Sequence, residues 1–358
     1  MASSELDRIR ALTSIFGRDR STNERVLVGI GDDAAVLAPS AEPLVWTVDA
    51  AVEGVHFRRA WLTFEDIGYR STMAAVSDLG AMAAEPLGVL SALVLPPDVT
   101  DEDLYALARG QREAATACGT AVIGGNLARG GELSITTTAL GRAPSPAPRA
   151  GARPGDALWL LGPVGLAAAG LRFLQRHGEP PADSASLRAI QAWRRPRARI
   201  AEGLTLRGVA TGAVDISDGL ARDVGHLARA SNVRAVIESN AFEAHDLKPI
   251  GNEAHDFEAN AFEAHDLKPI ADEADPLERA VLRAVAAALG TSALDLALFG
   301  GEDYAIAFTA PPSASVPGAV RIGRIEAISG GASPGVVLER ADGSRSPLSA
   351  GGFDHFQR

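Results

Sequence analysis

The spacing of apolar residues along the chain predicts a mixture of helices and strands. Near the start, Leu6, Ile9, Leu12 and Ile15 recur at helical spacing, which predicts an amphipathic helix over residues 5–16. Aliphatic and β-branched runs elsewhere predict strands, and longer stretches with a period near 3.6 predict helices. The predicted strands cover residues 26–30, 44–48, 87–95, 121–123, 132–141, 157–161, 233–237, 304–308 and 336–338. The predicted helices cover residues 67–82, 101–118, 166–175, 197–207, 220–230 and 277–289.

A proline-rich stretch, PSPAP at residues 144–148, predicts a stiff linker between two halves of the chain. We therefore expect two domains, residues 1–148 and residues 149–358, which is reasonable for a chain of 358 residues. Helices and strands mix in both halves without strict alternation. This pattern favours an α+β fold over a doubly wound sheet.

A tandem repeat interrupts the second half. The sequence NAFEAHDLKPI at residues 240–250 returns unchanged at 260–270, and EAHD begins at residues 243, 253 and 263. A period of ten residues is too short for a helical solenoid. We expect a polar surface loop inserted in the C-terminal domain over about residues 240–275. A metal-binding tract of His and Asp residues is the alternative that the composition leaves open.

Composition and charge narrow the classes of partner. The net charge of −11 argues against nucleic acid or an anionic membrane surface as the main partner. The single cysteine, Cys118, excludes an internal disulfide framework and suits a reducing cytoplasm. The N-terminal sequence is not typical of a signal peptide, and no apolar run is as long as a membrane span. The expected location is therefore the cytoplasm, with neither nucleic acid nor membrane as a partner.

The lysine content excludes one common way of binding nucleotides. The only lysines are Lys248 and Lys268, and neither stands in the sequence GxxxxGK[ST]. A Walker A loop needs that lysine against the terminal phosphates. If the protein uses ATP, arginines, metal ions and backbone amides must hold the phosphates.

Five short acidic motifs, flanked by Gly, Ser or Thr, are expected at strand ends. They are GIGDDAAV (29–36), WTVDAAVEGVHF (46–57), AVSDLGAM (75–82), VDISDGLARD (214–223) and GGEDYAIAF (300–308). Mg²⁺ prefers carboxylate and water oxygens, and proteins often supply only one or two carboxylates for each ion. The set therefore predicts several Mg²⁺ ions bridging a polyphosphate. Any single motif has a simpler alternative, since Asp218 before Gly219 and Leu220 is also typical of a helix N-cap.

Three further features each allow a structural or a chemical interpretation. The glycine-rich sequences IGGN (123–126) and LGPVG (161–165) predict turns, which either connect elements or let backbone amides approach a phosphate. His56 is either a packed core histidine or a ligand contact. No Ser-His-Asp or Cys-His pairing is evident, so we do not expect a covalent nucleophile.

The motifs, taken in this order, resemble the thiamine-monophosphate kinase family. That family belongs to a superfamily with aminoimidazole ribonucleotide synthetase and selenophosphate synthetase, and the resemblance runs from about Leu12 to Phe356, interrupted by the repeats. The reactive N-terminal residue of selenophosphate synthetase and the C-terminal cysteine of the related hydrogenase-maturation protein are both missing. The resemblance implies direct transfer of the γ-phosphoryl group from ATP to thiamine monophosphate, with Mg²⁺. It also implies an N-terminal domain that binds ATP and Mg²⁺ and forms a dimeric barrel with its twin, and a larger C-terminal domain.

The resemblance also implies roles for individual residues. The implied metal-binding residues are Asp33, Thr47, Asp49, Asp78, Asp215, Asp218 and Asn126. The implied ATP contacts are Gly125, Asn126, Arg149 and Ser217, and the implied substrate contacts are His56, Glu302 and Phe353.

Three positions depart from the family pattern. Val48 stands where many members have a hydroxyl, Asn126 where many have aspartate, and Phe353 where some have tyrosine. Two alternatives to the kinase therefore remain open. The first is another ATP-using enzyme of the superfamily with a different phosphorylated or carboxylated substrate. The second is a catalytically weak nucleotide-binding protein, which the loss of ligands at Val48 and Asn126 would favour.

Overall fold

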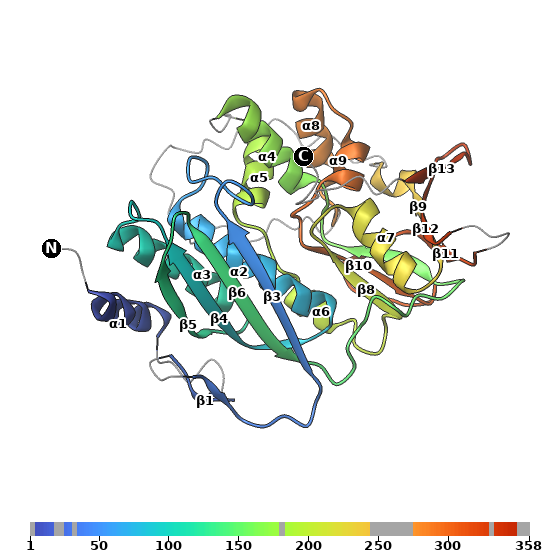
Figure 1. The fold of residues 1–358 in the computed structure, drawn as a ribbon. Helices are drawn as coiled ribbons and strands as arrows, with labels where there is room; N and C mark the ends of the chain where they lie inside the picture. Colours follow the sequence, from blue (N-terminus) through green and yellow to red (C-terminus); the bar gives the residue numbers. More distant parts are fainter. Residues whose placement is uncertain are drawn as a thin grey trace.

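A computed structural model shows helices packed against two β-sheets, one in each half of the chain (Figure 1). The structure describes residues 4–17, 25–30, 34–178, 183–243, 275–328 and 333–348. A small two-stranded sheet precedes the larger ones and pairs β1 (Val26–Val28) with β2 (Val36–Leu37). The mixture of helices and strands in both halves confirms the predicted α+β class.

The first large sheet has four strands in the order β3-β6-β4-β5. Strand β6 pairs antiparallel with both β3 and β4, whereas β5 runs parallel to β4. The strands are β3 (Leu44–Val52), β4 (Glu85–Leu95), β5 (Val122–Arg129) and β6 (Ser134–Arg142).

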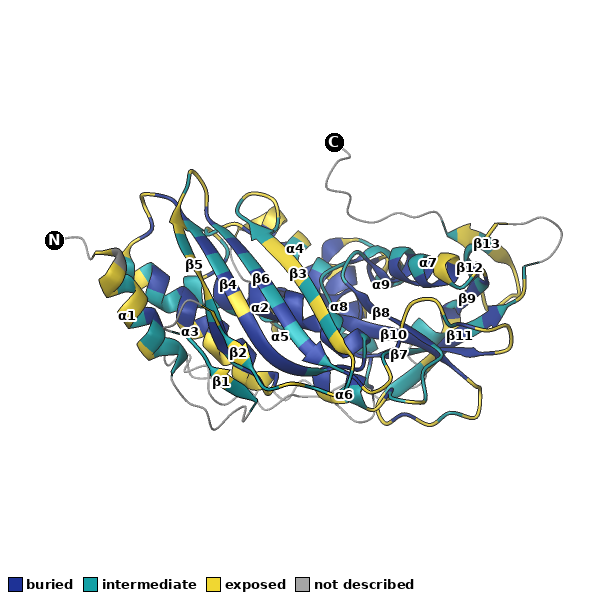
Figure 2. Cartoon of the chain, turned by 60° about the horizontal axis from the view of Figure 1, so that its bottom comes forward, coloured by how far each residue is buried: buried dark blue, intermediate teal, exposed yellow. Residues whose placement is uncertain are grey.

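Helices α2 (Phe64–Ala81) and α3 (Asp101–Ala117) cover one face of this sheet (Figure 1). Each begins with a capping box, in which Thr63 and Thr100 exchange hydrogen bonds with the third residue of the helix. On the uncovered face, side chains of β3 remain exposed, among them Trp46 (69%) and Val48 (63%) (Figure 2). The helix α1 (Glu5–Phe16), confirmed at its predicted bounds, packs beside α3.

The second sheet has seven strands among the described residues, in the order β13-β12-β9-β11-β7-β10-β8. Most neighbours are antiparallel, and β12 and β9 form a parallel pair. Strands β10 and β8, the last two at one end of the sheet, are buried along their whole length, because protein packs on both faces. The strands are β7 (Ala157–Leu161), β8 (Gly212–Ile216), β9 (Arg234–Glu238), β10 (Ala305–Ala310), β11 (Ala319–Glu326), β12 (Gly335–Glu339) and β13 (Arg345–Leu348).

Helices of the second half pack on one face of the seven-stranded sheet and build the largest hydrophobic core with it. They include α4 and α5, which lie against each other, and α7, which contacts β8, β9 and β12. The helices are α4 (Leu166–His177), α5 (Ser184–Arg194), α6 (Ile200–Leu204), α7 (Leu220–Ala230), α8 (Arg279–Leu289) and α9 (Ala293–Phe299), with a short 3-10 helix η2 (Ser239–Phe242).

Two local predictions are wrong. Residues 123–126 do not form a turn, because β5 continues through both glycines, and at Gly125 a side chain would collide with the carbonyl oxygen of Ser91. The helix predicted over residues 197–207 is shorter in the structure, where α6 begins at Ile200, after Pro196, and ends at Leu204. Helices α5 and α9 and strands β2, β8, β11 and β13 were not predicted. The expected repeat loop lies mostly outside the described residues.

No single described helix is both long and apolar enough to cross a membrane. Helices α8 and α9 together meet the length and composition required, but the chain bends by 108° between them.

Candidate active site

Carboxylates from both halves of the chain meet where α2 reaches the seven-stranded sheet. Thr47, on the helix-facing side of β3, donates a hydrogen bond of 2.5 Å to Asp78 on α2. The neighbouring Ser77 donates one of 3.0 Å to Asp215 on the buried strand β8. Asp49, two residues along β3 from Thr47, is close enough to raise the pKa of Asp78. The predicted residues Thr47, Asp49, Asp78 and Asp215 therefore form one acid cluster.

The acid cluster holds like charges in a poorly solvated place. Burial raises the pKa of Asp78, and the nearby Asp49 adds to the rise. Burial also raises the pKa of Asp215 to about 7, with Asp78 and Asp223 as further causes. The charge of the Arg149 guanidinium opposes both rises in pKa. A cation between these carboxylates would relieve their mutual repulsion.

The start of α7 lies beside the acid cluster, and its backbone amides already have a partner. The Asp223 carboxylate accepts hydrogen bonds from the amides of Ser217, Asp218 and Gly219, at 3.1, 2.9 and 3.1 Å. Gly219 is the N-cap, with φ of 114°, so the alternative that Asp218 caps this helix is wrong. The Asp218 carboxylate instead forms an ion pair with the Arg222 guanidinium at 3.5 Å, and it remains partly exposed.

The glycine turn at 161–165 is confirmed, but its amides are also occupied. Gly162 and Gly165 have φ values of 94° and 89°, which favour glycine. The Asp303 carboxylate accepts hydrogen bonds from the amides of Gly165 (2.6 Å) and Ala167 (2.9 Å) at the start of α4. This arrangement supports the structural interpretation of the turn and leaves those two amides unavailable to a phosphate.

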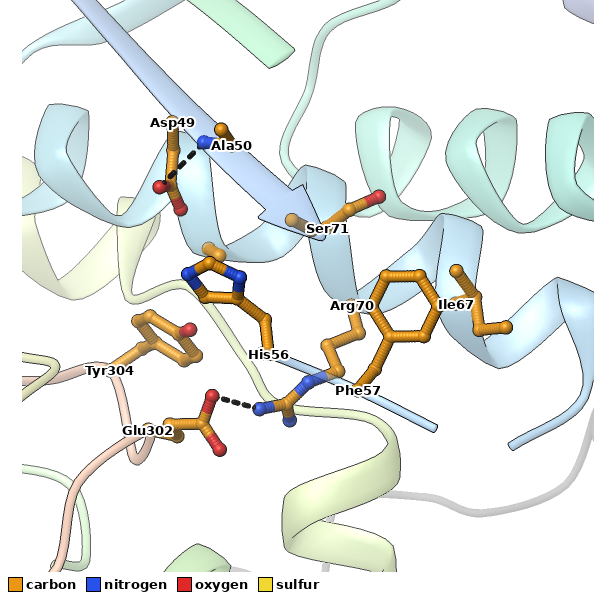
Figure 3. A pocket seen from close by; sticks show the side chains of 11 residues that line it. Asp49, Ala50, His56, Phe57, Ile67, Arg70, Ser71, Glu302 and Tyr304 are labelled. Carbon is orange, nitrogen blue, oxygen red and sulfur yellow. Dashed lines mark hydrogen bonds and ion pairs between the residues drawn. The ribbon is translucent and has the colours of Figure 1, made fainter. Parts of the chain in front are cut away.

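A pocket opens beside the acid cluster, between β3, α2 and the GGEDY segment (Figure 3). His56 projects into it between Asp49 and Glu302, and the His56 Nδ1 accepts a hydrogen bond of 3.1 Å from the Val52 amide. Tyr304 and Arg70 also line this pocket. The pocket therefore joins the predicted metal-binding Asp49 to both of the described residues that were predicted to contact the substrate.

The GGEDY segment is held in an unusual backbone conformation at this pocket. Glu302 and Tyr304 have φ values of 67° and 51°, which are unfavourable for residues with side chains. Their amides donate to the carbonyl oxygens of Ser217 (2.7 Å) and Ile216 (2.9 Å), which fix the segment against the end of β8. Such strain persists only where the surroundings hold it, and it is typical of functional sites.

Two residues that the sequence did not single out hold the Glu302 carboxylate. The buried Arg70 of α2 forms an ion pair with Glu302 and donates to the carbonyl oxygen of Trp193. The Trp193 indole donates a hydrogen bond of 2.8 Å to the same carboxylate, and the Arg70 guanidinium lies over the Trp193 ring. No local motif marks either residue: Arg70 stands in an ordinary helical pattern, and Trp193 lies in α5, which was not predicted.

Two predicted ATP contacts lie away from the acid cluster within one chain. Gly125 and Asn126 are on the edge strand β5, and the register carries Asn126 through Ala92 and Thr136 to Ala50 on β3. Three strand spacings amount to about 14 Å. Asn126 also shares the uncovered face of the sheet with Ala50, whereas Thr47 points toward Asp78. Asp33 and Phe353 lie outside the described residues.

Val48 does not remove a ligand from the helix-facing side of β3. Alternation along the strand places its side chain on the uncovered face, 63% exposed, opposite to Thr47. The absence of a hydroxyl at Val48 therefore leaves the Thr47 and Asp78 pair unchanged.

Comparison with known proteins agrees with the fold and the position of the motifs. The AIR synthase related protein N-terminal domain matches residues 31–143, and the C-terminal domain of the same family matches residues 153–265. A solved structure described as AaThiL complexed with AMPPCP and TMP has a TM-score of 0.72 and 27% identity, covering 98% of this chain and 97% of its own. A hydrogenase maturation protein bound to ATP, at 20% identity and a TM-score of 0.69, shares the fold.

Curated relatives narrow the family. The chain is 33% identical to the thiamine-monophosphate kinase of Salmonella typhimurium, over 83% of this chain and 80% of the relative. It is 30% identical to the thiamine-monophosphate kinase of Haemophilus influenzae, over 100% of this chain and 99% of the relative. The chain therefore belongs to the thiamine-monophosphate kinase family within the AIR synthase related proteins.

Proposed function

We propose that this protein transfers the γ-phosphoryl group of ATP to thiamine monophosphate, giving thiamine diphosphate and ADP. An oxygen of the acceptor phosphate attacks the γ-phosphorus while the bond to the β-phosphate oxygen breaks. The observation that carries the proposal is the acid cluster of Asp49, Asp78 and Asp215 beside the His56 pocket, in a chain whose curated relatives are named for this reaction.

The donor set of the acid cluster fits Mg²⁺. Asp215 is buried and Asp78 is partly buried, both have raised pKa values and charged neighbours of the same sign, and Thr47 adds a hydroxyl. Among the described residues, no three His, Cys, Asp or Glu side chains converge closely enough to hold one ion by themselves. Mg²⁺ often takes one or two carboxylates and completes its octahedron with water and substrate phosphates. When bound, Mg²⁺ would neutralise phosphate charge and align the two polyanions.

The chain's own residues then have separate tasks. Asp49, Asp78, Asp215 and Asp218 would hold the ions, and the proposed ligand Asp33 would join them. Arg149 and Ser217 would contact ATP at the start of α7. His56 and Glu302 would face the acceptor, together with Phe353. Because phosphoryl transfer depends mostly on positioning and charge stabilisation, this arrangement needs no general base.

We propose direct transfer without a phosphorylated enzyme. The Cys118 thiol is buried, and burial raises its pKa to about 12, so it is no nucleophile at neutral pH. The acceptor phosphate is already ionised. After incubation with γ-labelled ATP and Mg²⁺ alone, acid-quenched protein should carry no label. A stoichiometric label that passes to added thiamine monophosphate at the turnover rate would overturn direct transfer.

We further propose a cytoplasmic homodimer with domains at residues 1–148 and 149–358. Support for the dimer comes from the uncovered face of the four-stranded sheet, where four large apolar side chains are exposed: Leu44 (58%), Trp46 (69%), Val48 (63%) and Leu90 (37%). A contiguous apolar face of this kind is typical of a protein interface. A second copy covering it would approach Asn126, which lies on the same face.

A single assay tests the activity. The protein is incubated with ATP, Mg²⁺ and thiamine monophosphate, and the products are separated by chromatography. Formation of thiamine diphosphate together with ADP is expected. ATP binding without any product would favour the nucleotide-binding alternative, and turnover only with another phosphorylated acceptor would favour a different enzyme of the superfamily.

A further inference from the structure

Arg149, for which we propose an ATP contact, follows the proline-rich linker directly and is exposed. Its guanidinium forms no hydrogen bond or ion pair within the part of the chain that the structure describes. Its charge nevertheless acts on the acid cluster, because it lowers the pKa of Asp78 and Asp215 against the effect of burial. A long side chain without a partner is not held by contacts of its own. The position of the guanidinium therefore depends on how the Arg149 backbone is fixed.

One side chain fixes that backbone from the end of α7. The Ser231 hydroxyl, at the C-cap of the helix, donates a hydrogen bond of 2.8 Å to the Arg149 carbonyl oxygen. It accepts two more, both of 3.1 Å, from the amides of Gly151 and Ala152. A serine hydroxyl offers one donor and two acceptor positions. Ser231 therefore uses its whole hydrogen-bonding capacity on residues 149–152.

The start of β8 holds the same segment from the other side. The Ala213 amide donates a hydrogen bond of 3.2 Å to the Pro148 carbonyl oxygen. A side-chain carbon at Gly151 would lie 1.7 Å from the Thr211 carbonyl oxygen, so only glycine allows this close approach. The Arg149 backbone is therefore fixed between the start of β8 and the end of α7.

From these contacts we propose that Ser231 is a positioning residue, which places the Arg149 guanidinium for ATP. The proposal rests on the proposed function, in which Arg149 and Ser217 contact ATP. Ser217 precedes α7 and Ser231 follows it, and the 11 residues of the helix span about 16 Å. The helix sets the distance between the two ATP contacts, since Asp223 holds the amides at its start and Ser231 holds the Arg149 backbone at its end. The Ser231 hydroxyl has no bonding capacity left for ATP itself, so its effect passes through Arg149.

The simpler alternative is that Ser231 only stabilises the junction between the linker and the second half. A purely structural role would lower the melting temperature and weaken the binding of both substrates alike. A positioning role acts on ATP through Arg149 alone. The two roles therefore differ in a double-mutant cycle, because the effect of removing the hydroxyl should disappear once Arg149 has been replaced.

The test measures binding by calorimetry, with a non-hydrolysable ATP analogue and Mg²⁺ and separately with thiamine monophosphate. The proteins are the wild type, Arg149→Ala, three variants of Ser231 (Ser231→Ala, Ser231→Thr and Ser231→Cys), and the double variant of Ser231→Ala with Arg149→Ala. Ser346→Ala is the matched control, because the Ser346 hydroxyl also accepts a hydrogen bond, of 3.1 Å from Arg340. Ser346 lies on β13, at the opposite end of the seven-stranded sheet from β8. Melting temperatures check that each variant folds.

Arg149→Ala should raise the Kd of the ATP analogue at least about tenfold, because a charge-assisted contact is lost. Ser231→Ala should raise it about fivefold in the wild-type background and less than about twofold in the Arg149→Ala background. Ser231→Thr keeps the hydroxyl and should stay within about twofold of the wild type. Ser231→Cys, with its weakly bonding thiol, should give a smaller rise of the same kind, and it carries the test if the alanine variant does not fold. The Kd of thiamine monophosphate should change less than about twofold in every variant, and Ser346→Ala should match the wild type throughout.

No rise in Ser231→Ala, a rise that persists in full in the Arg149→Ala background, or an equal rise for thiamine monophosphate would overturn the proposal. Unchanged binding of the ATP analogue in Arg149→Ala would remove the ATP contact and the proposal with it. Turnover is read separately. If the wild type forms no thiamine diphosphate while the coupling between Ser231 and Arg149 holds, the proposed activity fails and the role of Ser231 stands. If thiamine diphosphate forms normally but Ser231→Ala binds the ATP analogue as the wild type does, the role of Ser231 fails and the activity stands.

Discussion

At the scale of single residues, the acid cluster brings carboxylates of like charge close together, so that they repel one another. Asp78 and Asp215 lie on elements from different halves of the chain. The charge of Asp78 adds to the rise in the pKa of Asp215, and the charge of Asp49 adds to the rise in the pKa of Asp78. Such an arrangement destabilises the protein unless a cation compensates for it. The energetic cost is what we expect of residues kept for binding metal and phosphate rather than for folding.

Asp78→Asn should therefore separate activity from stability. The asparagine can still accept the Thr47 hydrogen bond, but one charge leaves the cluster. We expect kcat to fall at least about 10²-fold, roughly 2.7 kcal/mol of lost transition-state stabilisation. The melting temperature without Mg²⁺ should stay the same or rise. Asp98→Asn, at a surface carboxylate paired with Arg59, is the control and should keep full activity. Near-normal activity in Asp78→Asn would contradict the metal-binding role.

Asp303 gives a prediction about pH. Burial raises the pKa of this carboxyl from its ordinary 3.8 to about 7, the amides of Gly165 and Ala167 and the more distant Arg199 oppose the rise, and the neighbouring Glu302 adds to it. Because the folded-state pKa lies above the unfolded one, the stabilising contribution is complete below about pH 4. It is lost as the pH rises through 7.

Asp303→Asn cannot titrate, and it gives up one of the two backbone hydrogen bonds, worth about 1 kcal/mol. We expect the variant to melt below the wild type at pH 5, and the gap in melting temperature to narrow steadily up to pH 8. The other buried acids titrate in both proteins and cancel in the difference. A gap that stays constant over this range would show that Asp303 does not titrate there.

Sequence motifs identified the ionisable residues better than their partners. The acidic motifs named Asp49, Asp78 and Asp215, which the structure brings together. They did not reveal the role of Asp223, which stands inside the quoted VDISDGLARD motif but serves the backbone of α7. Arg70 and Trp193 carry no local signal at all, because their contact with Glu302 exists only after α2, α5 and the GGEDY segment pack together.

At the scale of elements, the crossing of α2 and α3 depends on two glycines. A side-chain carbon at Gly68 would lie 2.0 Å from the Leu107 carbonyl oxygen, and one at Gly110 would lie 1.9 Å from that of Glu65. The two helices therefore approach backbone to backbone, and this close contact sets the position of Asp78 on α2 relative to β3.

Gly68→Ala and Gly110→Ala should each lower the free energy of unfolding by about 1–3 kcal/mol, because the helices must move apart. Alanine would otherwise stabilise a helix by about 1 kcal/mol relative to glycine, so the sign of the change is diagnostic. Urea denaturation measures it. Gly131→Ala, where no atom lies within 4 Å, should change the stability by less than about 0.5 kcal/mol. Stabilisation at Gly68 or Gly110 would contradict the close crossing.

Elements with a strong period could be predicted from the sequence, and those defined by packing could not. The capped, periodic helices α1, α2 and α3 agree with their predictions to within a few residues. The strand predicted at β5 was too short, because Gly124 and Gly125 are typical of a turn. In the structure, pairing with β4 extends β5 through both glycines. Strand β11 carries arginines at Arg321 and Arg324. The ion pairs of Arg324 with Glu238 of β9 and Glu339 of β12 form only in the folded sheet.

At the scale of the whole molecule, the pocket joins the two halves. Its walls come from β3 and α2 on one side and from the GGEDY segment on the other, and Ser77 bonds to Asp215 across the same boundary. No pattern within either half predicts that contact, because it depends on how α2 docks against β8 and β10. Taken separately, the motifs predict only that each half of the chain contributes acidic residues to the site.

The uncovered sheet face leads to a prediction about the dimer. Asn126 lies on that face and not beside Asp78 of its own chain, so we expect it to complete the site of a partner that covers the face. Asp78→Asn and Asn126→Leu should then each be nearly inactive alone. When the two are unfolded together and refolded, about half of the dimers are mixed, and one of the two sites in each mixed dimer has both native residues. Activity should recover to about a quarter of the wild type.

The control is Trp46→Asp, which places a charge in the centre of the face, where burying it would cost several kcal/mol. It should sediment as a monomer, and adding it to both variants should abolish the recovery. If the mixture stays as inactive as its components while the wild type sediments as a dimer, Asn126 acts within its own chain or not at all.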